Sequence, residues 1–399
     1  MHLFGQYDKV AALASDTSIT PMGGPASAPP IENWSYDLPD FRPTGRLNDQ
    51  LPRWLQFGFE ERFRFEGYQG GGFNPKSGDA YFLNRLRIGT IIRPVSWFRI
   101  VAQTQDARSF LQTPPIGPPN TVRWDLKVAY AEFGDAETQP FSLRVGRQAF
   151  DFNSTILAAS EWRNQGRSFD GVVARGRLDR FRAAIFAGSV VIPLDAGISH
   201  HQEGNNIYGV YGGIDRVLPH SAIEPFVIWR VAPRLDEKAY GFRVRGREIS
   251  DFDYRAEWTG ERGTASGEQI QAWATTFGAG YRVASMSWRP RLFAGYDYAS
   301  GDKNPGDGTR GTFDSMYSTA HDRFGISDQF GWQNIVAGRV GATVEPHHRW
   351  SVTGQYLNFW LAQSRDAIYN SSGSAIFRDL SGRSGGHVGK NSICIAGTK

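Results

Sequence analysis

Several features that define other classes of protein are missing from this sequence of 399 residues. Its one cysteine, Cys394, excludes an intrachain disulfide framework and a cysteine-based zinc site. No apolar run approaches the roughly eighteen residues of a helical membrane span, and the mean hydropathy is −0.42. The first thirty residues also lack the basic and apolar regions of a signal peptide.

Lysine is scarce, although the chain is not poor in positive charge. Seven of the 44 basic residues are Lys and the other 37 are Arg, while the formal net charge is only +4. A guanidinium group is a planar fork that binds carboxylate or phosphate through two hydrogen bonds, whereas an ammonium group acts as a point charge. The excess of arginine reflects either codon usage or a function that needs guanidinium groups. The positions of the arginines in the predicted structure decide between these two explanations.

The motifs of common enzyme classes and metal sites are also absent. No Gly-x-Ser-x-Gly, P-loop or Gly-x-Gly-x-x-Gly occurs in a strand–helix setting, which argues against acyl and phosphoryl transfer. Paired histidines at 200–201 and 347–348 would point to opposite faces of a strand and chelate poorly. The Asp- and Asn-rich residues 301–314 lack the spacing of a calcium loop and have ordinary turn chemistry. We therefore expect no cofactor and no metal, and without a clustered basic helix we expect no nucleic-acid partner.

A strict alternation of residue types organises what is present. In residues 240–247, Tyr240, Phe242 and Val244 alternate with glycine and arginine, and residues 252–261 alternate aromatic and charged residues in the same way. Strand side chains point to opposite faces with period two, so each segment has one apolar face and one charged face. A soluble sandwich would bury the apolar face, whereas an outer-membrane barrel would expose it to lipid and turn the charged face to a wet lumen.

The alternation recurs sixteen times. Candidate strands cover residues 54–66, 80–92, 97–106, 123–133, 141–149, 168–177, 180–189, 206–216, 222–231, 240–247, 252–261, 268–282, 288–299, 334–345, 349–361 and 387–395. Short turns alternate with longer loops between them, as in barrels whose two rims differ. The sequence thus predicts an all-β protein, an antiparallel up-and-down transmembrane β-barrel over residues 51–395 that follows a poorly ordered lead-in, residues 1–50.

Arginine falls on the less apolar face of these strands. On the lipid face a mid-membrane Arg would cost about 2–4 kcal/mol, so this placement favours a barrel with arginines inside. In 143–148 the alternation sends Arg144 inward but Arg147 outward, unless a β-bulge or a rim position intervenes. Rings of Arg select anions, although acidic residues on the same face could simply pair with them and hold the shape. The candidate substrate pathway comprises Arg62, Arg64, Arg85, Arg87, Arg99, Arg144, Arg147, Arg243, Arg245, Arg255, Arg339, Glu60, Asp253, Glu257 and Asp297.

Several motifs follow one another along the chain: FEERFRFE, FLNRLRIG, QTQDARS, VGRQAF, RNQGRSFDGV, DYASGDKNPGDGTRGTFD and QYLNFW. Their order and spacing resemble those of the alginate-export family of outer-membrane porins. The resemblance implies an eighteen-stranded barrel in the bacterial outer membrane whose electropositive constriction passes anionic uronate polymer. About 16 of those 18 strands are visible, and the ending KNSICIAGTK lacks a terminal aromatic residue. We therefore expect a truncated or frame-shifted C-terminus and a missing export signal.

Three functions remain open from the sequence. The first is an outer-membrane channel, not an enzyme, that passes uronate polysaccharide such as alginate, or smaller organic anions, through an arginine-lined lumen, with residues 150–167 and 301–333 as candidate lids. The second is a β-barrel enzyme or a polysaccharide-binding surface protein, and the third is a soluble all-β protein. For the channel, the expected partners are the anion, outer-membrane lipid and periplasmic export components.

Overall fold

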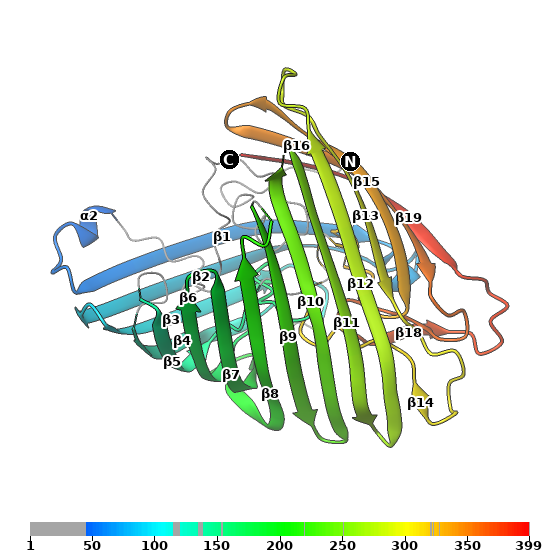
Figure 1. Ribbon diagram of the computed structural model, residues 1–399, viewed down its shortest axis with the longest axis horizontal. Helices are drawn as coiled ribbons and strands as arrows, with labels where there is room; N and C mark the ends of the chain where they lie inside the picture. Colours follow the sequence, from blue (N-terminus) through cyan, green and yellow to red (C-terminus); the bar gives the residue numbers. More distant parts are fainter. Residues whose placement is uncertain are drawn as a thin grey trace. The chain divides into compact units, whose positions relative to one another are not determined.

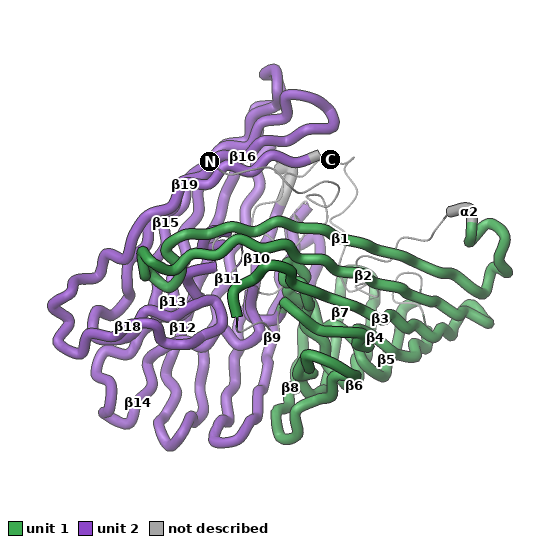
Figure 2. The backbone as a smooth tube through the Cα atoms, turned by 180° about the vertical axis from the view of Figure 1, so that it is seen from behind, with its two compact units in different colours: residues 1–5, 31–152, 158–211 green, residues 6–30, 153–157, 212–399 purple. Residues whose placement is uncertain are grey.

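The computed structural model describes residues 45–114, 120–134, 139–152, 155–218, 220–249, 251–319, 321, 323–326 and 328–398. The chain divides into two compact units, coloured separately in Figure 2. Among the described residues, unit 1 holds residues up to 152 and 158–211, and unit 2 holds 155–157 and those from 212 onward. The predicted lead-in lies outside the described residues except for 45–50, which include the short helix α2 (Gly45–Asn48).

Unit 1 is a succession of antiparallel strands, each paired with the next along the chain. The strands are β1 (Leu55–Gln69), β2 (Gly78–Val95), β3 (Phe98–Phe110), β4 (Val122–Phe133), β5 (Phe141–Gln148), β6 (Phe169–Leu178) and β7 (Phe181–Ile192). A single 3-10 turn, η1 (Gly71–Phe73), lies between β1 and β2. β8 (His200–Asp215) begins in unit 1 and ends in unit 2.

Unit 2 repeats the arrangement, and Figure 1 shows β9 to β12 as long neighbouring arrows of alternating direction. Its long strands are β9 (Ser221–Ala232), β10 (Leu235–Ile249), β11 (Phe252–Ala265), β12 (Glu268–Arg282), β13 (Arg291–Ala299), β15 (Ile335–His347), β16 (Trp350–Leu361) and β19 (His387–Thr398). Three short strands lie in the long connections: β14 (Thr309–Arg310), β17 (Ala367–Tyr369) and β18 (Ala375–Arg378). Exposed Cys394 lies on β19.

All sixteen predicted strands are present among the described residues, with ends that shift by a few positions. The three short strands were not predicted, because segments of two to four residues are too short to show a period. Within the described residues, no helix has the length and hydrophobicity needed to span a bilayer.

The two faces of the strands differ as the alternation predicts. On β1 the aromatic side chains are exposed, Phe63 to 70%, while Arg64 on the other face is 5% exposed. On β2, Phe82 and Ile88 are exposed and Arg85 is 1% exposed. We call the polar, buried side of each strand its covered face. Since a soluble sandwich would bury the aromatic side, this pattern is that of a sheet whose outer surface contacts hydrocarbon.

The alternation is interrupted within β5. Gly146 on β5 has φ 127°, and a Cβ there would lie 2.3 Å from the carbonyl oxygen of Ala129. Both Arg144 and Arg147 are consequently buried, although alternation alone sends Arg147 outward. A glycine in this backbone conformation redirects the chain locally. The sequence left Arg147 open between an outward position and an irregularity in the strand, and the structure has the irregularity, at Gly146.

Connections of different length alternate in unit 2. Those after β10 and β15 are two-residue turns, and the one after β12 spans residues 283–290. At the opposite ends of the strands, the connections after β13 and β16 span residues 300–334 and 362–386, next to two hairpin turns at 233–234 and 266–267. In this unit, the connections at one end of the strands are thus longer than those at the other end, as the predicted loop lengths indicate.

Candidate functional site

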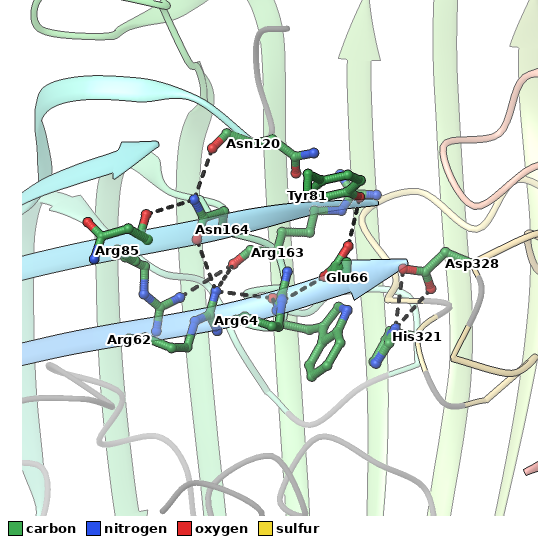
Figure 3. Close-up of polar contacts among 12 residues, drawn as sticks. Arg62, Arg64, Glu66, Tyr81, Arg85, Asn120, Arg163, Asn164, His321 and Asp328 are labelled. Atoms are coloured by element: carbon green, nitrogen blue, oxygen red, sulfur yellow. Dashed lines mark hydrogen bonds and ion pairs between the residues drawn. The ribbon is translucent and has the colours of Figure 1, made fainter. Parts of the chain in front are cut away.

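In unit 1, a chain segment packs against the arginines of β1 and β2 on their covered faces (Figure 3). The Arg62 guanidinium donates to the carbonyl oxygens of Glu161 (3.1 Å), Trp162 (3.3 Å) and Arg163 (3.0 Å). Arg64 donates to the Trp162 carbonyl, and its guanidinium carbon lies 4.2 Å from the centre of the Trp162 ring. The two arginines thus hold the backbone of residues 161–163, because each guanidinium has several donors in a fixed plane.

Glu161 places a carboxylate among the cations behind this segment. Its Oε2 lies 2.7 Å from Nη2 of Arg87 and 3.6 Å from Nη1 of Arg85, and its Oε1 lies 3.1 Å from Nζ of Lys127. Arg85 also contacts Glu60 Oε1 at 2.7 Å. Burial alone would raise the pKa of Glu161, but the charges of Arg87, Lys127 and Arg85 outweigh it and hold that pKa far below its usual range.

Hydrophobic and amide contacts fix the rest of the segment. Phe150 stacks on Phe169 with ring centres 4.7 Å apart, and Phe152 stacks on Tyr211 at 5.3 Å. The fully buried Asn164 amide donates to the carbonyl oxygens of residues 84, 108 and 120, at 2.9, 3.2 and 2.9 Å. A buried amide with three acceptors is strongly localised, so the segment is anchored on both sides of Glu161.

Two further acidic residues of unit 1 pair with the predicted arginines of β3 and β5. Arg99 Nη2 and Arg144 Nη2 both contact Oε2 of Glu132, at 2.7 and 3.0 Å. Arg147 donates to Oδ1 of Asp170 from Nε (2.7 Å) and to Oδ2 from Nη2 (3.0 Å). This two-pronged geometry is the strong form of an arginine–carboxylate pair.

In unit 2, Arg243 and Arg245 donate to a carboxylate rather than to backbone carbonyls. Arg243 donates to Oε2 of Glu224 at 2.5 Å, and Arg245 donates to Oε1 of the same residue at 3.1 Å. The Glu224 carboxylate is 1% exposed. Nearby in sequence, Asp253 accepts from Arg291 Nε at 2.7 Å. The pairing follows from strand register, since Arg243 lies directly opposite Glu224.

Asp297 joins a second group in unit 2. Its two oxygens accept from Arg323 (3.2 Å) and Arg339 (3.0 Å). Glu257 on β11 instead accepts hydrogen bonds from Thr155, 3.2 Å from its backbone nitrogen and 2.8 Å from its Oγ1. Arg323 comes from the connection after β13, so this predicted lid contributes a charge to the covered face. Burial lowers the pKa of Arg323, and Asp297 opposes that effect.

Arg255 differs from its neighbours. No described residue forms a hydrogen bond or an ion pair with its guanidinium, and its Nε is buried without a partner. The charges of Arg323, Arg339, Asp297 and Glu257 act on it without a direct contact. A guanidinium that lies among other charges but is not paired with one of them can donate hydrogen bonds to an anionic group from outside the protein.

The predicted site residues thus fall into two sets, one per unit, and each set is divided into smaller clusters. Arg62, Arg64, Arg85, Arg87 and Glu60 share the first, with Arg99, Arg144 and Arg147 on nearby strands, while the remaining predicted residues lie in unit 2. Sequence reasoning missed Lys127, Glu132, Glu161 and Glu224. Glu224 falls on the covered side of a predicted strand, which was an available signal, whereas Glu161 lies in a connection without periodicity. Lys127 and Glu132 are five positions apart in one predicted strand, so strict alternation turns only one of them inward. Both are buried because the register of β4 against β3 shifts next to Lys127.

The antiparallel succession of strands, with aromatic residues outside and charges on the covered face, defines a porin-like outer-membrane β-barrel. The family model for alginate export matches residues 53–392, so the chain belongs to the alginate-export family. No curated protein matches the chain in sequence.

Solved structures with a similar fold are outer-membrane porins. OccAB4 of Acinetobacter baumannii has a TM-score of 0.54 at 12% identity, covering 86% of this chain and 97% of that one. OccK8 (OprE) of Pseudomonas aeruginosa has a TM-score of 0.53 at 12% identity, covering 80% and 85%. OccK2 (OpdF) of Pseudomonas aeruginosa, solved in complex with glucuronate, has a TM-score of 0.50 at 9% identity, covering 77% and 80%.

These findings confirm the predicted family, the predicted fold class and the predicted location in the bacterial outer membrane. The chain is therefore an outer-membrane channel protein of this family. The expectation that it is not an enzyme agrees with its family and its structural neighbours, which are transport proteins.

Proposed function

We propose that this chain passes anionic sugar acids, uronate monomers or uronate polymer, along a positively charged pathway on the covered face of the barrel. The arginine cluster of unit 1 carries the proposal. Five cations surround three carboxylates there: Arg62, Arg64, Arg85, Arg87 and Lys127 against Glu60, Glu66 and Glu161. This excess of positive charge attracts anions, and the low dielectric of the walls strengthens the field.

The pairing of the arginines suits passage rather than tight binding. A permeant must be attracted strongly enough to enter and held weakly enough to leave. Most guanidinium groups already donate to a carbonyl or a carboxylate of the chain, so an arriving anion competes with an existing partner. Arg255 offers an uncommitted fork among the described residues, and we assign it the first contact with the permeant in unit 2.

A uronate is the substrate class that fits this chemistry and the relatives. The family is that of alginate export, and the similar porin OccK2 was solved with glucuronate. A uronate carries a carboxylate, which a guanidinium binds in a planar, two-bonded geometry, and hydroxyl groups that replace water on polar side chains.

Substitution of Arg255 tests the proposal. In planar bilayers, R255Q should lower the anion-to-cation permeability ratio by roughly twofold and weaken the block of current by oligouronate. It removes one charge without leaving a carboxylate unpaired. R177Q is the matched control, since Arg177 is exposed at the end of β6 and its loss should change neither quantity. A cation-selective wild-type channel would contradict the proposed function, and an unchanged ratio in R255Q would remove Arg255 from the pathway.

A further inference from the structure

A row of polar side chains crosses four strands on the outward face of unit 2. Trp229 on β9 lies opposite Lys238 on β10, Lys238 lies opposite Arg262 on β11, and Arg262 lies opposite Gln271 on β12. All four are exposed, whereas the covered face of the same strands carries Glu237 and Glu261, both fully buried. The row therefore belongs to the surface that faces the membrane rather than to the pathway.

The residues on either side of this row set its depth. Two positions further from the hairpin turns, the outward face carries Tyr240 and Trp273, about 7 Å deeper at strand spacing. Aromatic residues of this kind form a girdle at the boundary between hydrocarbon and headgroups. Trp229 belongs to the row of polar side chains, and an indole ring is at home at the same boundary. The row therefore lies at the level of the lipid headgroups.

An open depression of about 680 Å³ adjoins the row on the side of the turns. Arg234, Asp236 and Thr264 line it, together with residues of the 266–267 turn. Apolar rings, then basic groups, then a hollow follow one another along the strands. A lipid with a large phosphorylated headgroup has the matching order of groups: acyl chains, then phosphate, then a bulky polar part.

The charges of this surface are unbalanced. Asp236 accepts hydrogen bonds from Lys238 Nζ and from Trp229 Nε1, each at 3.0 Å. It is the only acidic residue among those of the row and those that line the depression. Arg262 donates to a backbone carbonyl at 2.7 Å, and no described residue pairs with the Arg234 side chain. Three cations thus surround one carboxylate, which favours an anionic group on the ligand.

The position of the turns selects the leaflet. The hairpin turns at 233–234 and 266–267 lie at the same strand ends as the long connections of unit 2, 300–334 and 362–386. Long connections of outer-membrane barrels face the outside of the cell, and short ones face the periplasm. The row therefore meets the headgroups of the outer leaflet.

We propose that Lys238 and Arg262 bind the phosphorylated headgroup of an outer-leaflet lipid, with its acyl chains over Tyr240 and Trp273. Lys238 and Arg262 lie directly opposite each other across the strand pair, so their exposed side chains can reach the same phosphate. The depression beside Arg234 and Thr264 accommodates the sugar or other polar part of the head. This site is separate from the proposed pathway and does not depend on it.

Native mass spectrometry of the full chain in detergent tests the site. The probes are an acylated disaccharide lipid that carries phosphates and the same lipid without them. K238Q/R262Q should weaken binding of the phosphorylated probe by roughly tenfold or more, while K238R/R262K should retain it. R177Q/R180Q, which removes two exposed cations at a short turn of unit 1, should leave it unchanged.

Each result bears on the proposal. Equal binding of the phosphorylated probe to wild type and K238Q/R262Q would overturn it, as would equal weakening in R177Q/R180Q. Displacement of the probe by millimolar inorganic phosphate would also overturn it, because the site would then serve free phosphate. If the double variant does not insert, the single variant K238Q gives the same comparison. Ion selectivity should not change in any of these variants, which keeps this test distinct from that of the proposed function.

Discussion

Each unit contains a pair of arginines two residues apart on one strand, and the two pairs are held in different ways. In unit 1, Arg62 donates to the neutral carbonyl oxygens of residues 161–163, and Arg64 donates to that of Trp162 beside its ion pair with Glu66. In unit 2, Arg243 and Arg245 share the carboxylate of Glu224 on the neighbouring strand. The first arrangement ties a connection to the wall, whereas the second ties one strand to the next.

The nature of the acceptor decides what the guanidinium group does. A carbonyl oxygen satisfies the hydrogen bonds of arginine but leaves its charge uncancelled, so the charge of Arg62 persists. A carboxylate cancels the charge, and the gain repays part of the cost of burying both ions. The same spacing of two arginines therefore holds a connection in the pair of unit 1 and joins two strands in the pair of unit 2.

The largest expected effect comes from removing the shared acceptor of unit 2. E224A leaves the buried Arg243 and the half-buried Arg245 without their carboxylate, so the free energy of unfolding should fall by about 3–5 kcal/mol. The remaining charges should also raise the anion-to-cation permeability ratio. Urea unfolding in detergent, followed by tryptophan fluorescence, measures the first effect, and bilayer recordings measure the second.

E203A is the control for this experiment, because exposed Glu203 on β8 carries the same charge without burial. It should leave the free energy of unfolding within about 0.5 kcal/mol of wild type. Equal stability of E224A and E203A would mean that the pairing in unit 2 does not join its strands.

A smaller effect should follow from releasing the segment of unit 1. R62Q removes the hydrogen bonds from the guanidinium to carbonyls 161–163, and each bond from a charged donor contributes about 1.5–3 kcal/mol. Amide hydrogen exchange in residues 158–167 should therefore accelerate roughly tenfold or more, with little change in β1 and β2. R245Q, whose partner is a carboxylate, should leave this segment unaffected. The same acceleration in both variants would erase the difference between the units.

The smallest effect concerns pH. Because the folded pKa of Glu161 is lowered, the stabilisation by this carboxylate is complete above its unfolded pKa and is lost as the pH falls through the folded value. The exchange difference between wild type and E161Q in residues 158–167 should thus stay constant from about pH 7 to pH 5 and shrink only below about pH 4. A difference that vanishes near pH 6 would show that the surrounding cations do not hold Glu161 charged.

The sequence alone predicts the strands well, because the period of two is explicit in residues such as Phe63, Phe65, Arg62 and Arg64. Each strand must expose one face to hydrocarbon and cover the other, which leaves little freedom for residue choice. The predicted faces of β1 and β2 are accordingly those of the structure.

The positions of the connections could not be predicted in the same way. Residues 150–167 have no period, so they indicated only a long loop or a lid. Their packing depends on tertiary contacts, such as Phe150 on Phe169 and Asn164 on three backbone carbonyls. Ile156, Leu157 and Ala158 within a loop were a usable signal, since apolar residues in a connection indicate burial. The inward turn of Arg147 depends on the φ angle of Gly146, which no residue pattern reveals.

The exposed aromatic face has a practical consequence. Trp97, Trp229 and Trp273 each leave between 39 and 55% of their surface uncovered by protein. Indole emission shifts to shorter wavelength when hydrocarbon replaces water around the ring, and brominated acyl chains quench it on contact. The emission wavelength and the quenching of the native tryptophans therefore report insertion of the chain into a bilayer, without a mutation or an attached label.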